Sequence, residues 1–185
     1  MIVGDCVCRL GRPGVELSAI HDEVTRVLQI LPLAEEPSLI TVCSNNKLHK
    51  WSYFSIEDGT SELVLERSYI LSGGTPKTIT TACLPPNSDS IFVGTLGGVT
   101  YPIDVHLYGM SPEIISPARA RDRLGFKEER DPGAVQCIVM NPTSKRQLLI
   151  GHETNYFELW DVFSTKPAKH TQPVSYTHLT LPTKA

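Results

Sequence analysis

Three stretches decide the fold of this chain: Ser38-Leu-Ile-Thr-Val-Cys-Ser-Asn-Asn-Lys-Leu-His-Lys-Trp51, Ser90-Ile-Phe-Val-Gly-Thr-Leu-Gly-Gly-Val-Thr-Tyr-Pro-Ile103 and Gln147-Leu-Leu-Ile-Gly-His-Glu-Thr-Asn-Tyr-Phe-Glu-Leu-Trp160. Each has an apolar strand, a tight turn and a second apolar strand that ends at a large side chain. The turn residues are Asn45-Asn46, Gly97-Gly98 and Thr154-Asn155. Such residues reach the positive φ angles of tight turns, so each stretch predicts a β-hairpin.

The same elements precede each hairpin. Apolar segments at 24–31, 78–84 and 134–140 are each followed by a loop that contains proline. A strand, a proline-containing loop and a hairpin, repeated three times, are typical of the inner three strands of a propeller blade. We therefore predict an all-β fold, a partial β-propeller of about three blades, with units at about 15–54, 63–106 and 134–163. The apolar positions at 63–71 indicate an outer strand or a lengthened hairpin loop.

The bulk composition excludes some classes of protein. The 185 residues carry a formal net charge of -3, and the pI is near 6.1. A general nucleic-acid binder needs a cationic surface, so we expect no nucleic-acid partner. No apolar run approaches the roughly 18–20 residues that span a bilayer, and the first residues do not resemble a signal peptide. The expected location is cytoplasmic, with no transmembrane segment.

The cysteines do not form a disulfide framework or a zinc motif. Cys43, Cys83 and Cys137 lie within apolar strand-like segments, where a thiol acts as a small hydrophobic side chain. Cys6 and Cys8 form the only close pair, and two ligands do not make a zinc site. We expect reduced cysteines, no metal and no cofactor.

Two segments fall outside the repeat. Residues 111–132 combine basic Arg119, Arg121 and Arg123 with acidic neighbours, which predicts an inserted, charged surface loop. The alternative is that these arginines contact an acidic partner or a phosphoinositide surface, although such clusters usually hold about four or more unopposed bases. The segment 174–185 does not continue the pattern, and we expect a non-native or disordered tail there.

Four motifs, in order, resemble the lethal giant larvae family of WD-repeat proteins, which includes the tomosyns. The first is Gly11-Arg-Pro-Gly-Val with His21, and the second is Leu48-His-Lys-Trp51. The third is Phe92-Val-Gly-Thr-Leu-Gly-Gly-Val99, with leucine where the family has glutamate, and the fourth ends at Leu159-Trp160-Asp161. The resemblance covers residues from about 11 to 162. The blade-closing residues are 52 and 57 positions apart, beyond the roughly 40–45 of a WD repeat, so loop insertions are expected.

The resemblance implies a scaffold that acts in cell polarity and regulated exocytosis. Proteins of this family bind syntaxin-type SNAREs and non-muscle myosin II, join polarity complexes and associate with the cell cortex or the peripheral plasma membrane. The chain resembles later blades of the first of two propellers. The alternative to this scaffold is an unrelated WD-repeat adaptor. A third hypothesis is a regulator of small GTPases with activator activity. The residues assigned to blade structure are Trp51, Ile103, Trp160, Asp161 and His21, and Arg119, Arg121 and Arg123 are assigned to partner contact.

Catalysis is not expected. His21-Asp22, with Ser18 nearby, is the best local set for a hydrolase, but adjacent residues on an extended chain face opposite ways. We expect His21 to hydrogen-bond within its blade, and His49 and His152 to be structural or exposed. The glycine pairs at 73–74 and 97–98 do not continue into a phosphate-binding motif and predict turns.

The alternation of apolar residues also predicts a core. Its members are Val27, Ile30, Ile40, Val42, Trp51, Cys83, Ile91, Val93, Ile103, Val135, Ile138, Leu149, Ile150 and Trp160. Because a blade buries its faces only against neighbouring blades, we expect a chain of three blades to be marginally stable or prone to aggregation.

Overall fold

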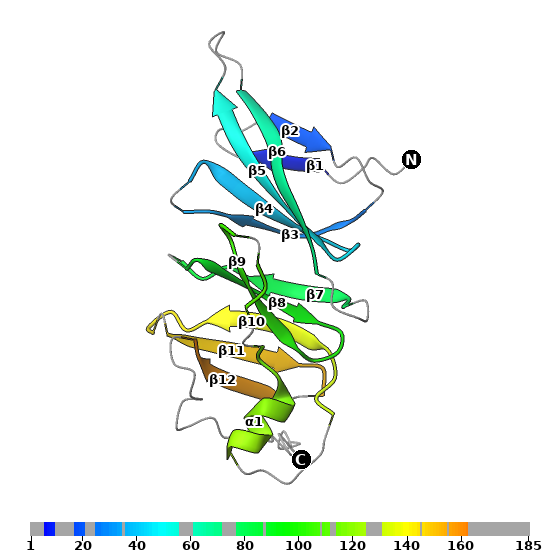
Figure 1. Ribbon diagram of the computed structural model, residues 1–185, viewed down its shortest axis with the longest axis vertical. Helices are drawn as coiled ribbons and strands as arrows, with labels where there is room; N and C mark the ends of the chain where they lie inside the picture. The colour runs from blue at the N-terminus through cyan, green and yellow to red at the C-terminus, as the bar shows by residue number, and fades with distance from the viewer. Residues whose placement is uncertain are drawn as a thin grey trace, which may run out of the picture.

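The computed structural model contains stacked antiparallel sheets, and this all-β partial propeller confirms the predicted fold class (Figure 1). The residues that the structure describes are 6–9, 17–20, 25–34, 36–55, 61–71, 77–86, 88–107, 109–111, 114–124, 131–144, 146–154 and 156–162. His21, Asp22, Asn155 and the predicted tail at 174–185 lie outside these residues.

Three sheets correspond to the three repeated units. The first is β3 (Val27–Pro32), β4 (Ser38–Cys43), β5 (Lys47–Ser55) and β6 (Ser61–Ile70). The second is β7 (Ile79–Cys83), β8 (Ser90–Thr95) and β9 (Thr100–Asp104), and the third is β10 (Val135–Met140), β11 (Gln147–His152) and β12 (Phe157–Asp161). A short pair, β1 (Cys6–Arg9) and β2 (Leu17–Ile20), lies beside β6. Within each of the three sheets, strands adjacent in sequence are adjacent in space, as hairpin connections require.

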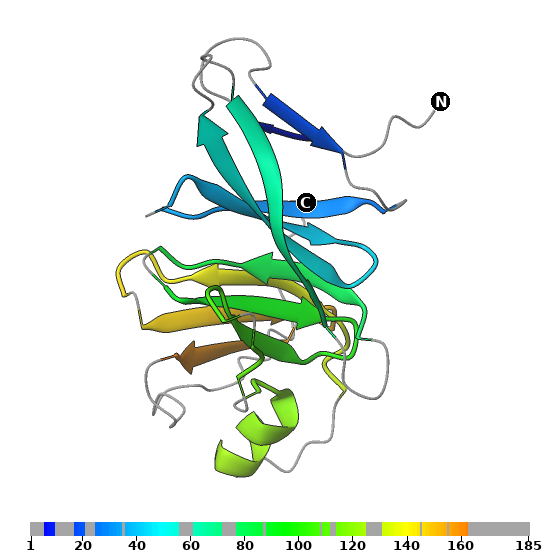
Figure 2. The ribbon, with the colours of Figure 1, turned by 45° about the horizontal axis from the view of Figure 1, so that its top comes forward.

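The first unit differs from the prediction at both ends, and β2, within its predicted bounds, pairs with β1 in a separate sheet. Strand β6 pairs along its length with β5, so residues 61–70 belong to the first sheet and not to the start of the second unit. Of the two alternatives for 63–71, the outer strand is the one observed. The long hairpin of β5 and β6 extends beyond β3 and β4 of the same sheet, as Figure 2 shows.

Two of the predicted turns have the left-handed backbone that their residues favour. Asn46 has φ of 63° and Gly98 has φ of 74°. Asparagine and glycine accept this conformation at little steric cost, unlike other residues. These turns set the register in which Val42 faces Leu48 and Gly94 faces Thr100.

The sheets pack face to face around two main apolar clusters. One is centred on Ile40, Val42, Leu48 and Ile91 between the first two sheets, and the other contains Val135, Leu148, Ile150 and Trp160. Most of the predicted core residues are buried. Val27 and Cys83 are only half-buried, and burial raises the pKa of the Cys83 thiol.

Two side chains of the predicted core are exposed, and so is one cysteine of the strand-like segments. Ile30 is 42% exposed, Leu149 is 39% exposed and Cys137 is also exposed. Side chains alternate between the two faces of a strand, and Leu148 and Ile150 occupy the buried face of β11. Leu149 therefore lies on the opposite face. It shares this face with its cross-strand partners Val139 and Leu159, and with Cys137 and Phe157. We call these five residues the terminal face.

Polar side chains join each sheet to the next along its first strand. Strand β7 lies between β3 and β10. Asn46 Oδ1 accepts a hydrogen bond from Ile79 N at 2.9 Å, and Gln29 Oε1 accepts one from Ala82 N. On the other side, Thr80 Oγ1 donates to the carbonyl of Val135 at 2.6 Å. These hydrogen bonds satisfy backbone groups on the outer edges of β7 and β10. Both strands are edge strands of their own sheets.

The predicted charged loop at 111–132 contains a helix, α1 (Pro117–Leu124). Pro117 occupies the first helical position, where its missing N–H is not needed, and the Ser116 hydroxyl accepts a hydrogen bond from Arg119 N at 3.2 Å. Ala120 packs into the cluster around Trp160. The charges of this segment suggested a loop, whereas its proline, serine cap and alanines form a short helix.

Candidate functional site

The residues assigned to blade closure occupy equivalent positions in the three sheets. Trp51, Ile103 and Trp160 are buried on the third strands, and each pairs with the second residue of the strand before it. Trp51 Nε1 donates to Thr41 Oγ1 on the neighbouring strand at 3.0 Å. In the third sheet Ile150 takes the place of this threonine, and Trp160 Nε1 instead donates to Glu158 two residues earlier. Asp161 lies next to Trp160 and pairs with Arg146 at 3.1 Å.

The arginines assigned to partner contact lie on α1. Arg119 is half-buried, and its Nη1 donates to the carbonyl of Ile114 at 3.0 Å. This bond ties the helix to the segment before it, so part of Arg119 has a structural role. Arg121 and Arg123 lie on the same helix. The assignment of the three residues to partner contact stays a prediction.

A cleft lies between the first two sheets. Its volume is about 370 Å³. Three connections build it: the β3–β4 loop at 33–37, the β7–β8 loop at 84–89 and the turn that follows β9. Apolar walls come from Leu33, Leu84, Pro85 and Val105, which are among its lining residues. The prolines of these loops stop the strands and open this space, because proline cannot continue a ladder of hydrogen bonds.

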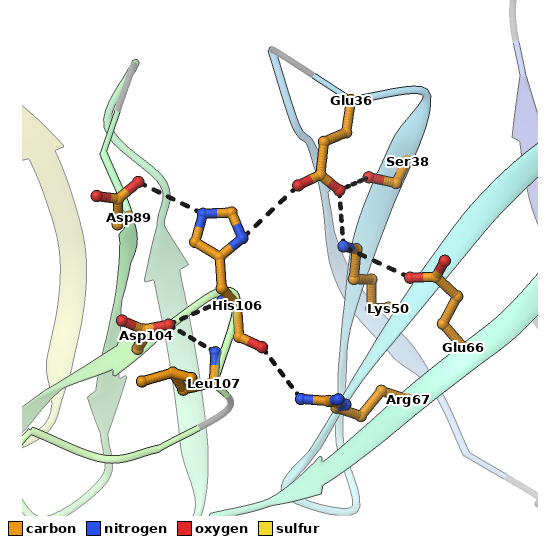
Figure 3. A network of polar contacts seen from close by, with 9 residues as sticks. All are labelled: Glu36, Ser38, Lys50, Glu66, Arg67, Asp89, Asp104, His106 and Leu107. Atoms are coloured by element: carbon orange, nitrogen blue, oxygen red, sulfur yellow. Dashed lines mark hydrogen bonds and ion pairs between the residues drawn. The ribbon is translucent and has the colours of Figure 1, made fainter.

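An ion-pair network forms one side of the cleft (Figure 3). Glu36 Oε2 lies 2.7 Å from Lys50 Nζ and accepts a hydrogen bond from Ser38 Oγ at 3.0 Å. Lys50 also lies 3.5 Å from Glu66. The hydrogen bond from Lys50 lowers the pKa of Glu36, with support from Ser38 and against a smaller effect of burial. Burial disfavours the charged form of Lys50, but Glu36 and Glu66 outweigh it and raise its pKa. Both partners are therefore charged at neutral pH.

His106 lies between acidic side chains from both sheets (Figure 3). Its Nδ1 is 3.6 Å from Glu36 Oε1, and its Nε2 is 3.5 Å from Asp89 Oδ1. Asp104 Oδ1 accepts hydrogen bonds from the backbone N–H groups of His106 and Leu107, at 2.8 and 2.7 Å. Arg67 Nη1, from β6 of the first sheet, donates to the His106 carbonyl at 3.0 Å. The turn after β9 is thus fixed by both sheets.

This arrangement is suited to recognition by contact. The fixed turn presents Leu107, which is 78% exposed, next to a cleft with apolar walls and carboxylates at its edge. Within the described residues, no group of three metal-ligating side chains is placed to hold an ion. His49 and His152, predicted as structural or exposed, are both buried in their sheets. Again within the described residues, no helix is long and apolar enough to cross a membrane.

Sequence reasoning missed this site because its members are far apart along the chain. Glu36, Lys50, Asp89 and His106 come from four connections or strands, and only the stacking of the sheets brings them together. One local signal was present: the loops at 34–37 and 85–89 both combine proline with an acidic residue. Both loops join the first strand of a sheet to the second, and so they occupy equivalent positions in successive sheets.

Comparison with known proteins identifies relatives along most of the chain. The LLGL scribble cell polarity complex component 2 of Danio rerio is 30% identical over 171 residues, and its human counterpart is 29% identical over 174 residues. The Lethal(2) giant larvae protein of Drosophila melanogaster is 23% identical over 157 residues. These matches cover 86%, 86% and 82% of this chain, but the chain spans only 16%, 16% and 13% of the relatives. No family model matches the chain.

Proposed function

Because this chain is a homologue of the lethal giant larvae proteins, we propose that it is part of a non-catalytic scaffold that binds protein partners in cell polarity. The observation that carries the proposal is the similarity over 86% of the chain to a protein named as a component of a cell polarity complex. The partial propeller supports it, since stacked sheets present fixed loops and clefts to other proteins.

The finer proposal concerns partners and location. Family resemblance favours syntaxin-type SNAREs and non-muscle myosin II as partners, a part in regulated exocytosis and a place at the cell cortex. If this is right, the full-length protein that contains this segment should co-precipitate syntaxin or myosin II heavy chain from a detergent extract. Absence of both would refute the finer proposal and leave the polarity scaffold standing.

A chimera tests the scaffold proposal in a complete protein. The matched segment of the Danio rerio relative would be replaced by residues 6–162 of this chain and expressed in epithelial cells that lack the relative. We expect the chimera to restore apical–basal polarity, measured by the distribution of apical and lateral marker proteins. A chimera that is produced at the normal level and reaches a folded state, yet restores no polarity, would contradict the proposal.

A further inference from the structure

The cleft between the first two sheets combines an apolar floor with negative charge at its edge. Its lining residues include Leu33, Leu84 and Val105 on the apolar side and Glu36 and Asp89 on the acidic side. Among the described residues that line it, the titratable side chains are Glu36, Asp89 and His106, and none is a lysine or arginine. Lys50, which lies outside the lining, balances the charge of Glu36, so the negative charge at the edge comes chiefly from Asp89.

The two carboxylates keep part of their capacity to bind a ligand. The Asp89 side chain is 83% exposed, and its contact at 3.5 Å with Nε2 of His106 leaves its carboxylate open to solvent. Glu36 uses Oε2 for Lys50 and Ser38, while Oε1 faces the imidazole of His106 across 3.6 Å. Lys50 holds Glu36 in position and keeps it ionised. The two acids thus flank one entrance to the cleft, from opposite sheets.

We propose that this cleft binds an extended segment of a partner protein, which places an arginine or lysine side chain against the exposed carboxylate of Asp89 and an apolar side chain against Leu33 and Leu84. The inference rests on the proposed scaffold function, for which it names a class of partner. Charge complementarity decides the class: the exposed carboxylate of Asp89 favours a cation, whereas an acidic peptide or an anionic lipid surface would be repelled.

The neighbouring turn adds a second contact. Leu107 lies one residue from His106, and its backbone N–H is fixed by Asp104 at 2.7 Å. A rigid, exposed leucine loses little conformational freedom when a partner covers it, which favours binding. A segment that enters the cleft beside His106 therefore also buries Leu107, so two apolar contacts lie on either side of the basic residue.

A peptide library tests the preference directly. The 185-residue chain is immobilised and exposed to heptapeptides whose central residue is fixed in turn and whose other positions are randomised. We expect peptides centred on arginine or lysine to be retained above those centred on glutamate or aspartate, and to be released by salt. Equal retention, or a preference for acidic centres, would overturn the proposal. The same experiment with vesicles of phosphatidylserine should show no retention, and strong retention there would also overturn it.

Variants then place the binding in the cleft. For a selected basic peptide, Asp89→Asn should weaken binding about two- to fivefold, as expected for an exposed ion pair, and Asp89→Lys should weaken it further, to about tenfold. Glu153→Gln removes an equal charge from the β11–β12 turn and should leave the affinity unchanged. Because Asp89 is largely exposed, its variants should keep the wild-type circular dichroism spectrum. Equal affinities for the Asp89 and Glu153 variants would refute the location.

A photo-crosslinking peptide provides a second measurement that needs no variant. With a diazirine group next to the basic residue, we expect mass spectrometry to recover crosslinks in the loops at 33–37 and 84–89 and in the turn at 105–107. Crosslinks confined to other loops would refute the site.

The chimera separates this inference from the function on which it rests. A chimera that restores polarity, but whose chain shows no preference for basic peptides, leaves the scaffold function intact and refutes the cleft. If the chain selects basic peptides but its chimera restores no polarity, the cleft proposal stands and the scaffold function is refuted.

Discussion

Asn46 closes a hairpin with its backbone and attaches the next sheet with its side chain. Its backbone takes the left-handed conformation of the β4–β5 turn, with φ of 63°, and its carbonyl oxygen also accepts a hydrogen bond from Leu71 N. Its side-chain oxygen accepts the N–H of Ile79 at the start of the second sheet. The residue that closes a hairpin therefore also attaches the next sheet, and the two effects can be measured separately.

Replacing Asn46 should separate the turn from the attachment. Asn46→Gly keeps the turn and removes the bond to Ile79, which is worth about 0.5–1.5 kcal/mol. Asn46→Ala also places an ordinary side chain in the left-handed region, at a further 1–2 kcal/mol or so. We expect the alanine variant to unfold at a lower urea concentration than the glycine variant. Equal midpoints would mean that the backbone conformation contributes nothing.

His152 predicts a dependence of stability on pH. Burial lowers its pKa from 6.5, against smaller opposite effects of the Gly133 carbonyl and Asp131. The unfolded chain binds a proton on His152 at a higher pH than the folded chain does. The stabilisation that neutral His152 contributes is therefore complete above about pH 6.5 and is lost as the pH falls through the lower pKa of the folded state. The melting temperature of the wild type should therefore drop between pH 7.5 and 5.5 by more than that of His152→Gln. Parallel curves for the two proteins would show that His152 is not responsible.

At the scale of elements, a glycine lets the second and third sheets approach. A Cβ atom on Gly94 of β8 would lie 2.5 Å from Val135 Cγ1 and 3.0 Å from Thr81 Cγ2. A methyl group there must push β8 away from β10 or displace the valine, which is buried.

We therefore expect Gly94→Ala to destabilise the chain by about 1–3 kcal/mol, as overpacking does in other cores. Gly97→Ala is the matched control, because a Cβ atom at Gly97 would have no heavy atom within 4 Å. Urea denaturation followed by tryptophan fluorescence measures both. A Gly94 variant as stable as the Gly97 variant would show that the interface between the sheets adapts without loss.

Elements were predictable to different extents for physical reasons. The hairpins followed from turn residues, since Asn46 and Gly98 meet a local steric demand. The buried face of β11 could not be predicted from the sequence. Its residues Leu148, Leu149 and Ile150 form an unbroken apolar run, with no alternation to indicate which side chains are buried. Helix α1 was not recognised because charged residues dominate its sequence. The cleft depends on contacts between sheets, which the composition of its loops does not specify.

For the whole molecule, the stacking ends in an apolar surface. The terminal face carries Val139, which is 52% exposed, opposite Leu149. Contiguous exposed apolar side chains on a sheet mark a contact surface. When no partner covers them, they promote aggregation.

A charge on the terminal face should make the isolated chain more soluble. We expect Leu149→Lys to slow aggregation at 37 °C at least severalfold by light scattering, because a lysine opposes sheet-on-sheet contact. Ile70→Lys, which makes the same kind of change at an exposed position of β6, should have a smaller effect. Equal effects of the two variants would indicate that net charge alone governs solubility.

The polar bonds along β7 also bear on how such a chain can diverge. Gln29, Asn46 and Thr80 attach successive sheets through their first strands, while the far sides of the sheets hold a ten-residue strand in one case and a loop with a helix in another. Substitutions near the first strands disturb two sheets at once, whereas the far sides already hold elements as different as β6 and α1. Lineages that carry this architecture can therefore acquire insertions at the far sides of the sheets, and new partners through these insertions, while the fold is kept.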